Sequence, residues 1–184
     1  MERHHQSEYL VLRQTIAQRG ALRPILALCG IAFWAALLIA VLVLLPYPVA
    51  ASIPLLVLLV TFEVIRPLHF GAERIGRYLQ VFYEEDGASS RSLSDTPSWE
   101  RVAMSFGTVP GVGGHALFVP VFVLATAINY LAVLLPRPVA IELSVMAIPH
   151  LAFIVWLVAA DRAMRTQRAT ELARLREVRD KTNP

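Results

Sequence analysis

Cysteine and lysine are almost missing from this chain, and charged residues of either sign are sparse. Cys29 is the single cysteine among 184 residues, so no disulfide framework and no zinc site built from several cysteines can form within the chain. Sixteen of the seventeen basic residues are arginine, and Lys181 is the exception. Only 17% of the residues are charged, against about 25% in soluble domains. The composition therefore excludes a disulfide-rich secreted domain and fits an ordinary soluble domain poorly.

Residue sets that carry out chemistry are also missing. No Ser/His/Asp or Cys/His arrangement can be placed, and the adjacent His4 and His5 have no third ligand at metal spacing. The glycine-rich stretch 107–114 lacks the Lys-Ser/Thr pair of a phosphate-binding loop. We therefore predict no catalytic residues, no cofactor and no metal. The net charge of +3 is small and its arginines flank apolar runs, which indicates membrane topology rather than nucleic-acid binding.

What the chain does contain is long apolar runs. Hydrophobic residues make up 56% of it, the mean hydropathy is +0.55, and the surplus lies in four blocks. About 20 apolar residues span a bilayer as a helix. The blocks cover residues 25–45, 49–65, 116–135 and 139–160. The first is too long for the h-region of a signal peptide, about 7–15 residues, so it is expected to stay as an anchor. The sequence thus predicts an all-α membrane protein with four transmembrane helices.

A repeated heptapeptide predicts how these helices are paired. Leu44–Ala50 (LLPYPVA) and Leu134–Ala140 (LLPRPVA) each lie between two apolar runs. Proline cannot continue the preceding helix but suits the first turn of the next one, so each Pro-x-Pro is expected to be a tight corner. All basic residues except Arg137 lie outside the two corners. Because basic residues stay in the cytoplasm, both hairpins should run in–out–in, as a parallel pseudo-repeat with both termini cytoplasmic. The arginine bias fits a GC-rich bacterial genome, and hence a bacterial inner membrane.

The predicted organisation has five segments. We expect a cytoplasmic amphipathic helix over 1–23 and a transmembrane hairpin over 24–66 that turns at 46–48. A cytoplasmic stretch over 67–114 should hold an amphipathic helix, a polar linker and the glycine-rich segment. A second hairpin over 115–160 should turn at 136–138, and 161–184 should form a charged cytoplasmic helix that continues the fourth span.

Two helix faces are candidates for contacts. An apolar stripe after the second span, opposite Arg74 and Arg77, could lie on lipid headgroups or dock on a partner. It consists of Ile75, Tyr78, Leu79 and Phe82. In the first span, small residues four apart form a candidate helix-packing face: Ala32, Ala36 and Ala40. Trp34, on another face of that span, is expected to point at lipid or at a partner subunit.

Polar residues inside the apolar runs are the remaining candidates, because such residues are costly in lipid. They are Glu63, Arg66, Asn129, Glu142 and His150. Glu63 and Arg66 have the spacing of a pair on one helix, as do Glu73 with Arg77 and Glu177 with Lys181. Glu142 suits the first turn of its helix, where Arg137, Asn129 or Tyr130 could be its partner. A rise of about 1.5 Å per residue puts Asn129 roughly 10 Å and His150 roughly 18 Å below the outer corner. His150 could therefore bond to the Val145 carbonyl, which Pro149 frees, to Thr126, or to Glu63. It would then be either a packing residue or a proton relay.

The leading functional expectation is a non-enzymatic accessory or scaffold subunit of a larger membrane complex. Its partners would be the lipid bilayer and other membrane-protein subunits or further copies of itself. One alternative is a small oligomeric transporter or proton-conducting protein that uses His150 and Glu63. Another is a membrane enzyme that acts on lipid, with Glu142 or cytoplasmic histidines as acid–base groups.

Overall fold

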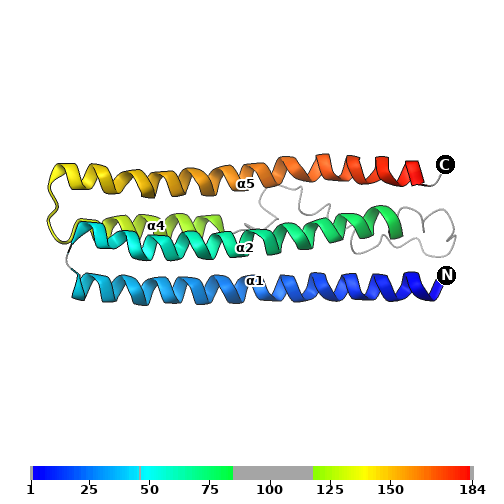
Figure 1. Ribbon diagram of the computed structural model, residues 1–184, viewed down its shortest axis with the longest axis horizontal. Helices are drawn as coiled ribbons and strands as arrows, with labels where there is room; N and C mark the ends of the chain where they lie inside the picture. The colour runs from blue at the N-terminus through cyan, green and yellow to red at the C-terminus, as the bar shows by residue number, and fades with distance from the viewer. Residues whose placement is uncertain (1, 46, 85–117, 183–184) are drawn as a thin grey trace. The chain divides into compact units, whose positions relative to one another are not determined.

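The computed structural model describes residues 2–45, 47–84 and 118–182, of which 94% are helical and none lies in a strand. Helix α1 (Glu2–Leu44) is followed by a short 3₁₀ helix, η1 (Pro48–Ala51), and then by α2 (Ser52–Leu79). A π-helical turn, η2 (Gln80–Glu84), ends this part (Figure 1). After the gap come α4 (Val119–Val133) and α5 (Ala140–Thr182). The all-α prediction is confirmed.

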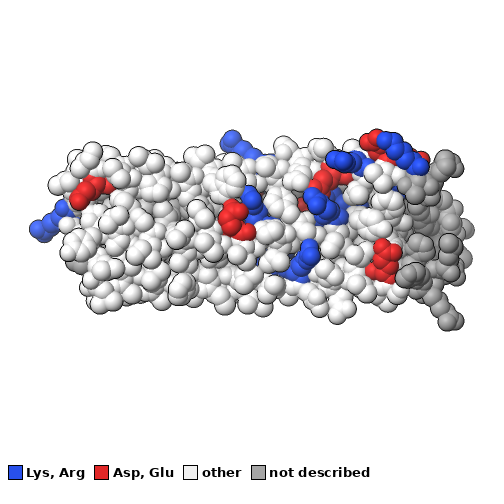
Figure 2. All heavy atoms as spheres, in the orientation of Figure 1, with Lys and Arg blue, Asp and Glu red and all other residues white. Residues whose placement is uncertain are grey.

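Three stretches are long and apolar enough to cross a membrane: Ser7–Leu44, Pro48–Tyr83 and Ala140–Lys181. Helix α4 is as apolar but has only 15 described residues. Large apolar side chains are exposed along all four helices, including Phe33, Leu56, Leu124 and Val155. A broad area without charged side chains is visible on the face drawn in Figure 2. An apolar exterior of this kind is what a lipid environment requires.

Two prolines near the ends of the apolar runs lie inside helices instead of at helix ends. Helix α1 runs through Pro24 without a break, so the short separate helix expected before Arg23-Pro24 is wrong. Helix α2 likewise contains Pro67. Proline removes one backbone N–H but leaves the rest of the helix ladder, and an apolar segment tolerates it when neighbouring groups compensate. The expected charged continuation of the last apolar run is confirmed, because α5 continues to Thr182.

The chain divides into two compact units. We call Leu22–Pro67 with Leu117–Ala163 the apolar unit, and Met1–Ala21, Leu68–Ala116 and Met164–Pro184 the charged unit. Helices α1, α2 and α5 contribute to both. Only seven charged residues fall in the apolar unit. Its limits lie within three residues of the ends that the hydropathy pattern gives to the first, second and fourth runs (Ile25, Ile65 and Ala160). Packing and hydropathy therefore divide the chain at nearly the same positions.

Aromatic rings and one close helix contact build the core of the apolar unit. Phe62 of α2 is fully buried and meets Phe122 of α4 and Phe153 of α5 edge-on, with ring centroids 5.5 and 6.3 Å apart. Gly30 of α1 lies so close to Thr61 of α2 that a Cβ at this position would collide with the threonine side chain. The missing side chain is thus what lets α1 and α2 approach here.

The two copies of the heptapeptide have different backbones. Tyr47, between the prolines of the first corner, is extended with φ −116° and ψ 134°, and η1 begins at once with Pro48. Arg137, at the equivalent position of the second corner, has φ 56°, in the left-handed region. Helix α5 starts only at Ala140, after three residues without regular structure. The two corners share six of seven residues, yet the residue between the prolines has a different backbone conformation in each.

Candidate functional sites

Asn129 is the centre of a buried polar network in the apolar unit. Its amide oxygen accepts a hydrogen bond from Trp34 Nε1 of α1 at 3.1 Å. Its amide nitrogen donates to the Ala51 carbonyl of η1 at 2.9 Å and faces His150 Nε2 of α5 at 2.9 Å. Asn129 is 0%, His150 2% and Trp34 6% exposed. One side chain on α4 therefore ties together residues of α1, η1 and α5.

The donors and acceptors of this network fit in one arrangement. A flipped Asn129 amide would place its N–H groups against the indole N–H and its oxygen against the Ala51 carbonyl, so the amide orientation is determined. His150 Nε2 then accepts from Asn129, and its Nδ1 carries the proton and donates to the Met146 carbonyl at 2.6 Å. His150 is thus a neutral imidazole with both ring nitrogens bonded. Polar groups buried in apolar surroundings need such complete pairing.

The residues that hydrogen-bond to His150 are not the ones expected from the sequence. Among the described residues, His150 is bonded neither to Thr126 nor to Glu63, and its carbonyl partner is Met146 rather than Val145. Thr126 donates to Phe122 O within its own helix. The depths estimated for Asn129 and His150 differ, yet their side chains are hydrogen-bonded to each other at 2.9 Å. Trp34, expected to face outward, is buried instead.

Glu63 has its own partners at the other end of the apolar run. It pairs with Arg66 at 3.2 Å, as the spacing predicted, and accepts a hydrogen bond from Trp156 Nε1 of α5 at 2.6 Å. The Arg66 guanidinium lies over the Trp156 ring, 5.1 Å from its centroid. Both charged side chains are about one-third exposed. An Arg–Trp–carboxylate group of this kind is typical of a membrane–water interface, where one end is apolar and the other wet.

Glu142 stabilises the start of α5. Its carboxylate accepts a hydrogen bond from the Val139 N–H at 2.9 Å. Val139 precedes the first helical residue and Glu142 occupies the third helical position, so this is the glutamate half of a capping box. The expected role at the helix N-terminus is therefore observed. Asn129 and Tyr130, the other suggested partners of Glu142, bond elsewhere, and Tyr130 Oη donates to Leu143 O at 3.3 Å.

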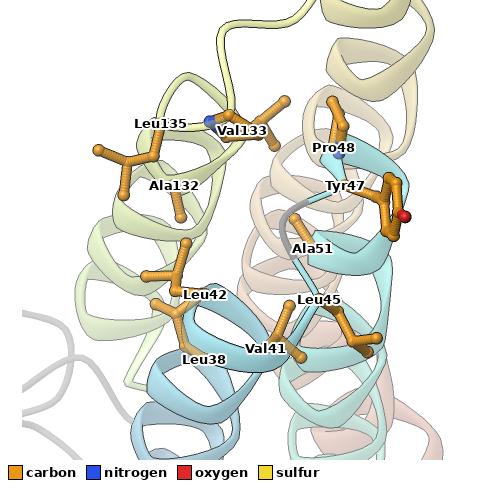
Figure 3. Close-up of a pocket in the computed structure, with 11 residues that line it drawn as sticks. Leu38, Val41, Leu42, Leu45, Tyr47, Pro48, Ala51, Ala132, Val133 and Leu135 are labelled. Atoms are coloured by element: carbon orange, nitrogen blue, oxygen red, sulfur yellow. The ribbon is translucent and has the colours of Figure 1, made fainter.

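Two hollows lie at the corners of the apolar unit. The first, about 150 Å³, is enclosed by α1, the first corner and the end of α4, and its side chains are nearly all aliphatic (Figure 3). Tyr47 brings the one hydroxyl among these lining residues, and none of them is charged. The second is a groove of about 300 Å³ between Tyr47–Val49 and the start of α5. Glu142 lines this groove, so the groove has a charged side chain and the first hollow has none.

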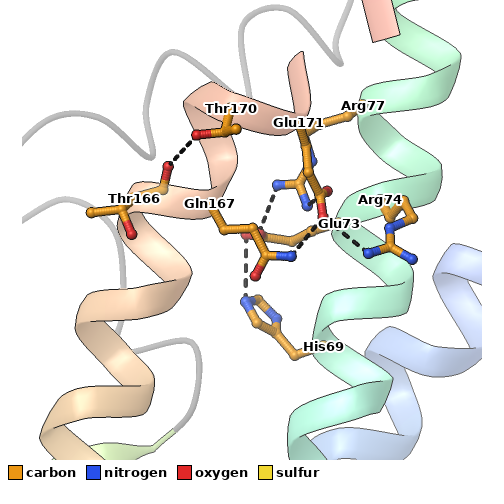
Figure 4. A network of polar contacts seen from close by, with 8 residues as sticks. All are labelled: His69, Glu73, Arg74, Arg77, Thr166, Gln167, Thr170 and Glu171. Atoms are coloured by element: carbon orange, nitrogen blue, oxygen red, sulfur yellow. Dashed lines mark hydrogen bonds and ion pairs between the residues drawn. The ribbon is translucent and has the colours of Figure 1, made fainter. Parts of the chain in front are cut away.

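The charged unit has a polar network of opposite character (Figure 4). Arg77 of α2 is only 2% exposed and contacts two carboxylates: Glu73 at 3.0 Å within α2, and Glu171 of α5 at 2.6 Å. Glu171 also accepts from Arg74 at 3.0 Å and from Gln167 at 2.7 Å. His69 Nε2 lies 3.4 Å from Glu73. The i, i+4 pair of Glu73 and Arg77 was predicted, but Arg77 was placed on the solvated face, which is wrong.

This network keeps its carboxylates ionised. Burial by itself would raise the pKa of Glu73, but the hydrogen bond and charge of His69, together with Arg77, outweigh it and lower the pKa from 4.5 to about 2. For Glu171 the same opposition holds, and Arg74, Arg77 and Gln167 lower its pKa against the effect of burial. The Arg77 guanidinium is thereby held between two negative charges, as a desolvated cation requires.

The two candidate contact faces lie differently from each other. Of the stripe after the second span, Leu79 is fully buried, whereas Ile75, Tyr78 and Phe82 are half-buried. Tyr78 packs on Phe82 at 4.8 Å and donates to Glu8 of α1 at 3.4 Å. Part of the stripe is therefore covered by the chain itself.

The small-residue face of α1 is directed away from the other helices. Ala32 and Ala36 are exposed and Ala40 is half-buried. The face that α1 buries consists instead of Ala27, Trp34, Leu38 and Val41. The three alanines spaced four residues apart mark a face where another helix could approach closely. They do not mark the face that α1 packs against the rest of this chain.

Some predicted features lie outside the described residues. These are the polar linker, a short helix expected at 97–106, the glycine-rich stretch 107–114 and His115. Within the parts that are described, no three His, Cys, Asp or Glu side chains gather as metal ligands would. The chain matches no protein-family model, no curated protein and no solved structure. The residues themselves are thus the whole basis for a functional proposal.

Proposed function

We propose that the protein is an integral membrane subunit that acts as a scaffold or accessory component of a larger membrane complex. In this proposal the four apolar runs form two in–out–in hairpins in a bacterial inner membrane, with both termini in the cytoplasm. The basic residues outside the corners support that orientation. The apolar exterior of three long helices supports the membrane location.

The observation that carries the proposal is the completeness of the Asn129 network. Trp34, Asn129 and His150 are the groups best suited to bind a substrate or move a proton within the apolar unit. Each instead hydrogen-bonds another member of the network or a backbone carbonyl. Of the two hollows at the corners, the first has only aliphatic side chains besides Tyr47, and the groove adds a single charged group, Glu142. Polar side chains that hold helices together, under an apolar surface, fit binding to neighbours better than transport or catalysis.

The outward face of α1 supports a helical partner. Ala32 and Ala36 are exposed and four residues apart, so another helix could approach the α1 backbone closely there. The charged end of α5, with its i, i+4 pair Glu177–Lys181 at 2.6 Å, offers a cytoplasmic surface. The proton-conducting alternative gains no support, because Glu63 and His150 have separate partners.

Photo-crosslinking in native membranes tests this proposal. A photoreactive residue replaces Ala36 in one variant and the buried Leu38 in the control. We expect Ala36 to crosslink to discrete neighbouring proteins or to a second copy, and Leu38 to give products within the chain. Lipid adducts alone from Ala36, in membranes where the protein is expressed at its native level, would contradict the scaffold role.

Cysteine accessibility tests the proposed topology separately. In a Cys29→Ala background, we expect a cysteine at Arg137 or Tyr47 to react with an impermeant reagent from outside. A cysteine at Glu8 or Glu177 should react only after the membrane is opened. Labelling of the cysteine at position 177 in intact cells would refute the orientation.

A further inference from the structure

The groove at the start of α5 combines apolar walls with one carboxylate, Glu142, and one phenol, Tyr47. Tyr47, Pro48 and Val49 form one side, and Ile141, Val145 and Met146 form much of the other. At about 300 Å³ it reaches the lower limit of small-molecule sites, about 300–1,000 Å³. All of its residues belong to the apolar unit.

Two polar groups line this groove and keep bonding capacity within the described part of the chain. One carboxylate oxygen of Glu142 accepts from the Val139 N–H, whereas the other has no polar partner there. The Tyr47 hydroxyl has none either, and the residue is 66% exposed. Figure 3 shows the Tyr47 ring on the far side of the first corner from Ala132 and Leu135. The ring is therefore directed away from the α4 side of the apolar cavity.

The chemistry of these groups selects a cation. A carboxylate accepts strong hydrogen bonds from an ammonium group, and the face of a tyrosine ring attracts the same charge. The N–H groups of the first turn of α5 carry only about half a positive charge, which one carboxylate more than offsets. A headgroup that carries a phosphate but no ammonium would offer Glu142 no opposite charge. The aliphatic side chains beside Glu142 suit the hydrocarbon attached to such a headgroup.

We propose that this groove binds the headgroup of phosphatidylethanolamine, with its ammonium on Glu142 and against the Tyr47 ring. The inference rests on the proposed function, since it needs both corners to lie at one membrane surface where lipid headgroups are present. A primary ammonium has three N–H donors, one of which fits the unpaired oxygen of Glu142. The trimethylated ammonium of phosphatidylcholine has none, so it should bind less well.

Glu142→Gln separates binding from folding. Glutamine is accepted at the third position of a capping box, so its amide oxygen can keep the bond to Val139 N–H. The variant removes the negative charge without removing the cap. Glu177→Gln is the matched control, because it also removes one exposed carboxylate but lies in the charged unit, paired with Lys181.

The experiment is native mass spectrometry of the full chain, released from vesicles with equal amounts of phosphatidylethanolamine, phosphatidylcholine and phosphatidylglycerol. We expect wild-type protein and Glu177→Gln to retain phosphatidylethanolamine above the other two lipids. Loss of a charged hydrogen bond should lower that retention about tenfold in Glu142→Gln. Tyr47→Leu should lower it less, because only the ring contribution is lost.

Three results would overturn the inference. Equal retention of phosphatidylethanolamine by wild type and Glu142→Gln is one, and preferential retention of phosphatidylglycerol is another. The third is a dimer that disappears in Tyr47→Leu, since a second copy would then be the occupant. None of these bears on the crosslinking from Ala36. The lipid experiment can therefore fail while the crosslinking supports the scaffold role, and the crosslinking can fail while the lipid is retained.

Discussion

The two buried polar networks of this molecule are built from different chemical groups. In the apolar unit, indole, amide, imidazole and backbone carbonyls meet around Asn129, and none of them carries a charge. In the charged unit, Arg77 is as deeply buried but lies between Glu73 and Glu171. A neutral network costs little to desolvate when every donor finds an acceptor, whereas a buried guanidinium needs opposite charge around it. The difference indicates which part of the chain is suited to lipid.

Removing Arg77 should be the most damaging change. Arg77→Met leaves Glu73 and Glu171 facing each other without their shared cation, which costs about 3–5 kcal/mol. Chemical unfolding of the purified protein in detergent, followed by circular dichroism, measures the loss. The matched variant adds Glu73→Gln and Glu171→Gln to Arg77→Met. It should recover most of the stability, because the two carboxylates no longer face each other and Arg74, which loses its partner, is well exposed. Equal destabilisation by both variants would show that charge is not the reason Arg77 matters.

Removing Asn129 should cost less, although it disconnects more helices. Asn129→Leu leaves the Trp34 N–H and His150 Nε2 without partners, but hydrogen bonds between membrane helices contribute only about 1–2 kcal/mol each. We expect a loss of about 2 kcal/mol, and a red shift of tryptophan emission if Trp34 meets water. Ser144→Ala, which removes only a bond to the carbonyl four residues earlier, is the control. No change in either signal would mean that the network does not hold the apolar unit together.

Local pairings could be predicted from the sequence, and the long-range ones could not. The spacings of Glu63–Arg66, Glu73–Arg77 and Glu177–Lys181 each predicted a contact that the structure contains. Such pairs depend only on the helical period of 3.6 residues. The contact of Arg77 with Glu171, 94 residues away, also needs the rotation and register of two helices, which hydropathy does not supply.

The corners illustrate the same limit. Both Pro-x-Pro motifs lie between helices, as predicted, but their identical flanks gave no sign that Arg137 would take a left-handed conformation and Tyr47 an extended one. The burial of Trp34 has a comparable cause. Tryptophan suits both a lipid-facing and a buried position. Trp34 is buried because its indole N–H has an acceptor in Asn129, which lies on another helix.

Acid should distinguish the two networks. Because the pKa of Glu73 is lowered from 4.5 to about 2, its contribution to stability is complete above pH 4.5 and is lost as the pH falls toward 2. We therefore expect the melting temperature in detergent to fall across this interval. Glu73→Gln should show a smaller fall, since it has no carboxylate to protonate. An identical pH profile for wild type and variant would contradict the role assigned to this pair.

The smallest expected effect comes from the exposed pair of the charged unit. Glu177 and Lys181 are well exposed and 2.6 Å apart, so Lys181→Met should lower the free energy of unfolding by only about 0.3–0.5 kcal/mol. In high salt the substitution should have no effect, because salt screens the pair. The same unfolding assay, run at low and high ionic strength, measures it. A loss as large as that of Arg77→Met would mean that burial does not control the strength of these charge contacts.

The central claim is that the polar side chains of the apolar unit hold helices together instead of moving protons, and the state of His150 tests it most directly. Nitrogen-15 solid-state NMR of histidine-labelled protein in lipid bilayers at neutral pH, with His150→Gln to assign the signal, reports each ring nitrogen. The account predicts a neutral ring with the proton on Nδ1 and an accepting Nε2. A protonated Nε2, or a charged imidazolium, would contradict it.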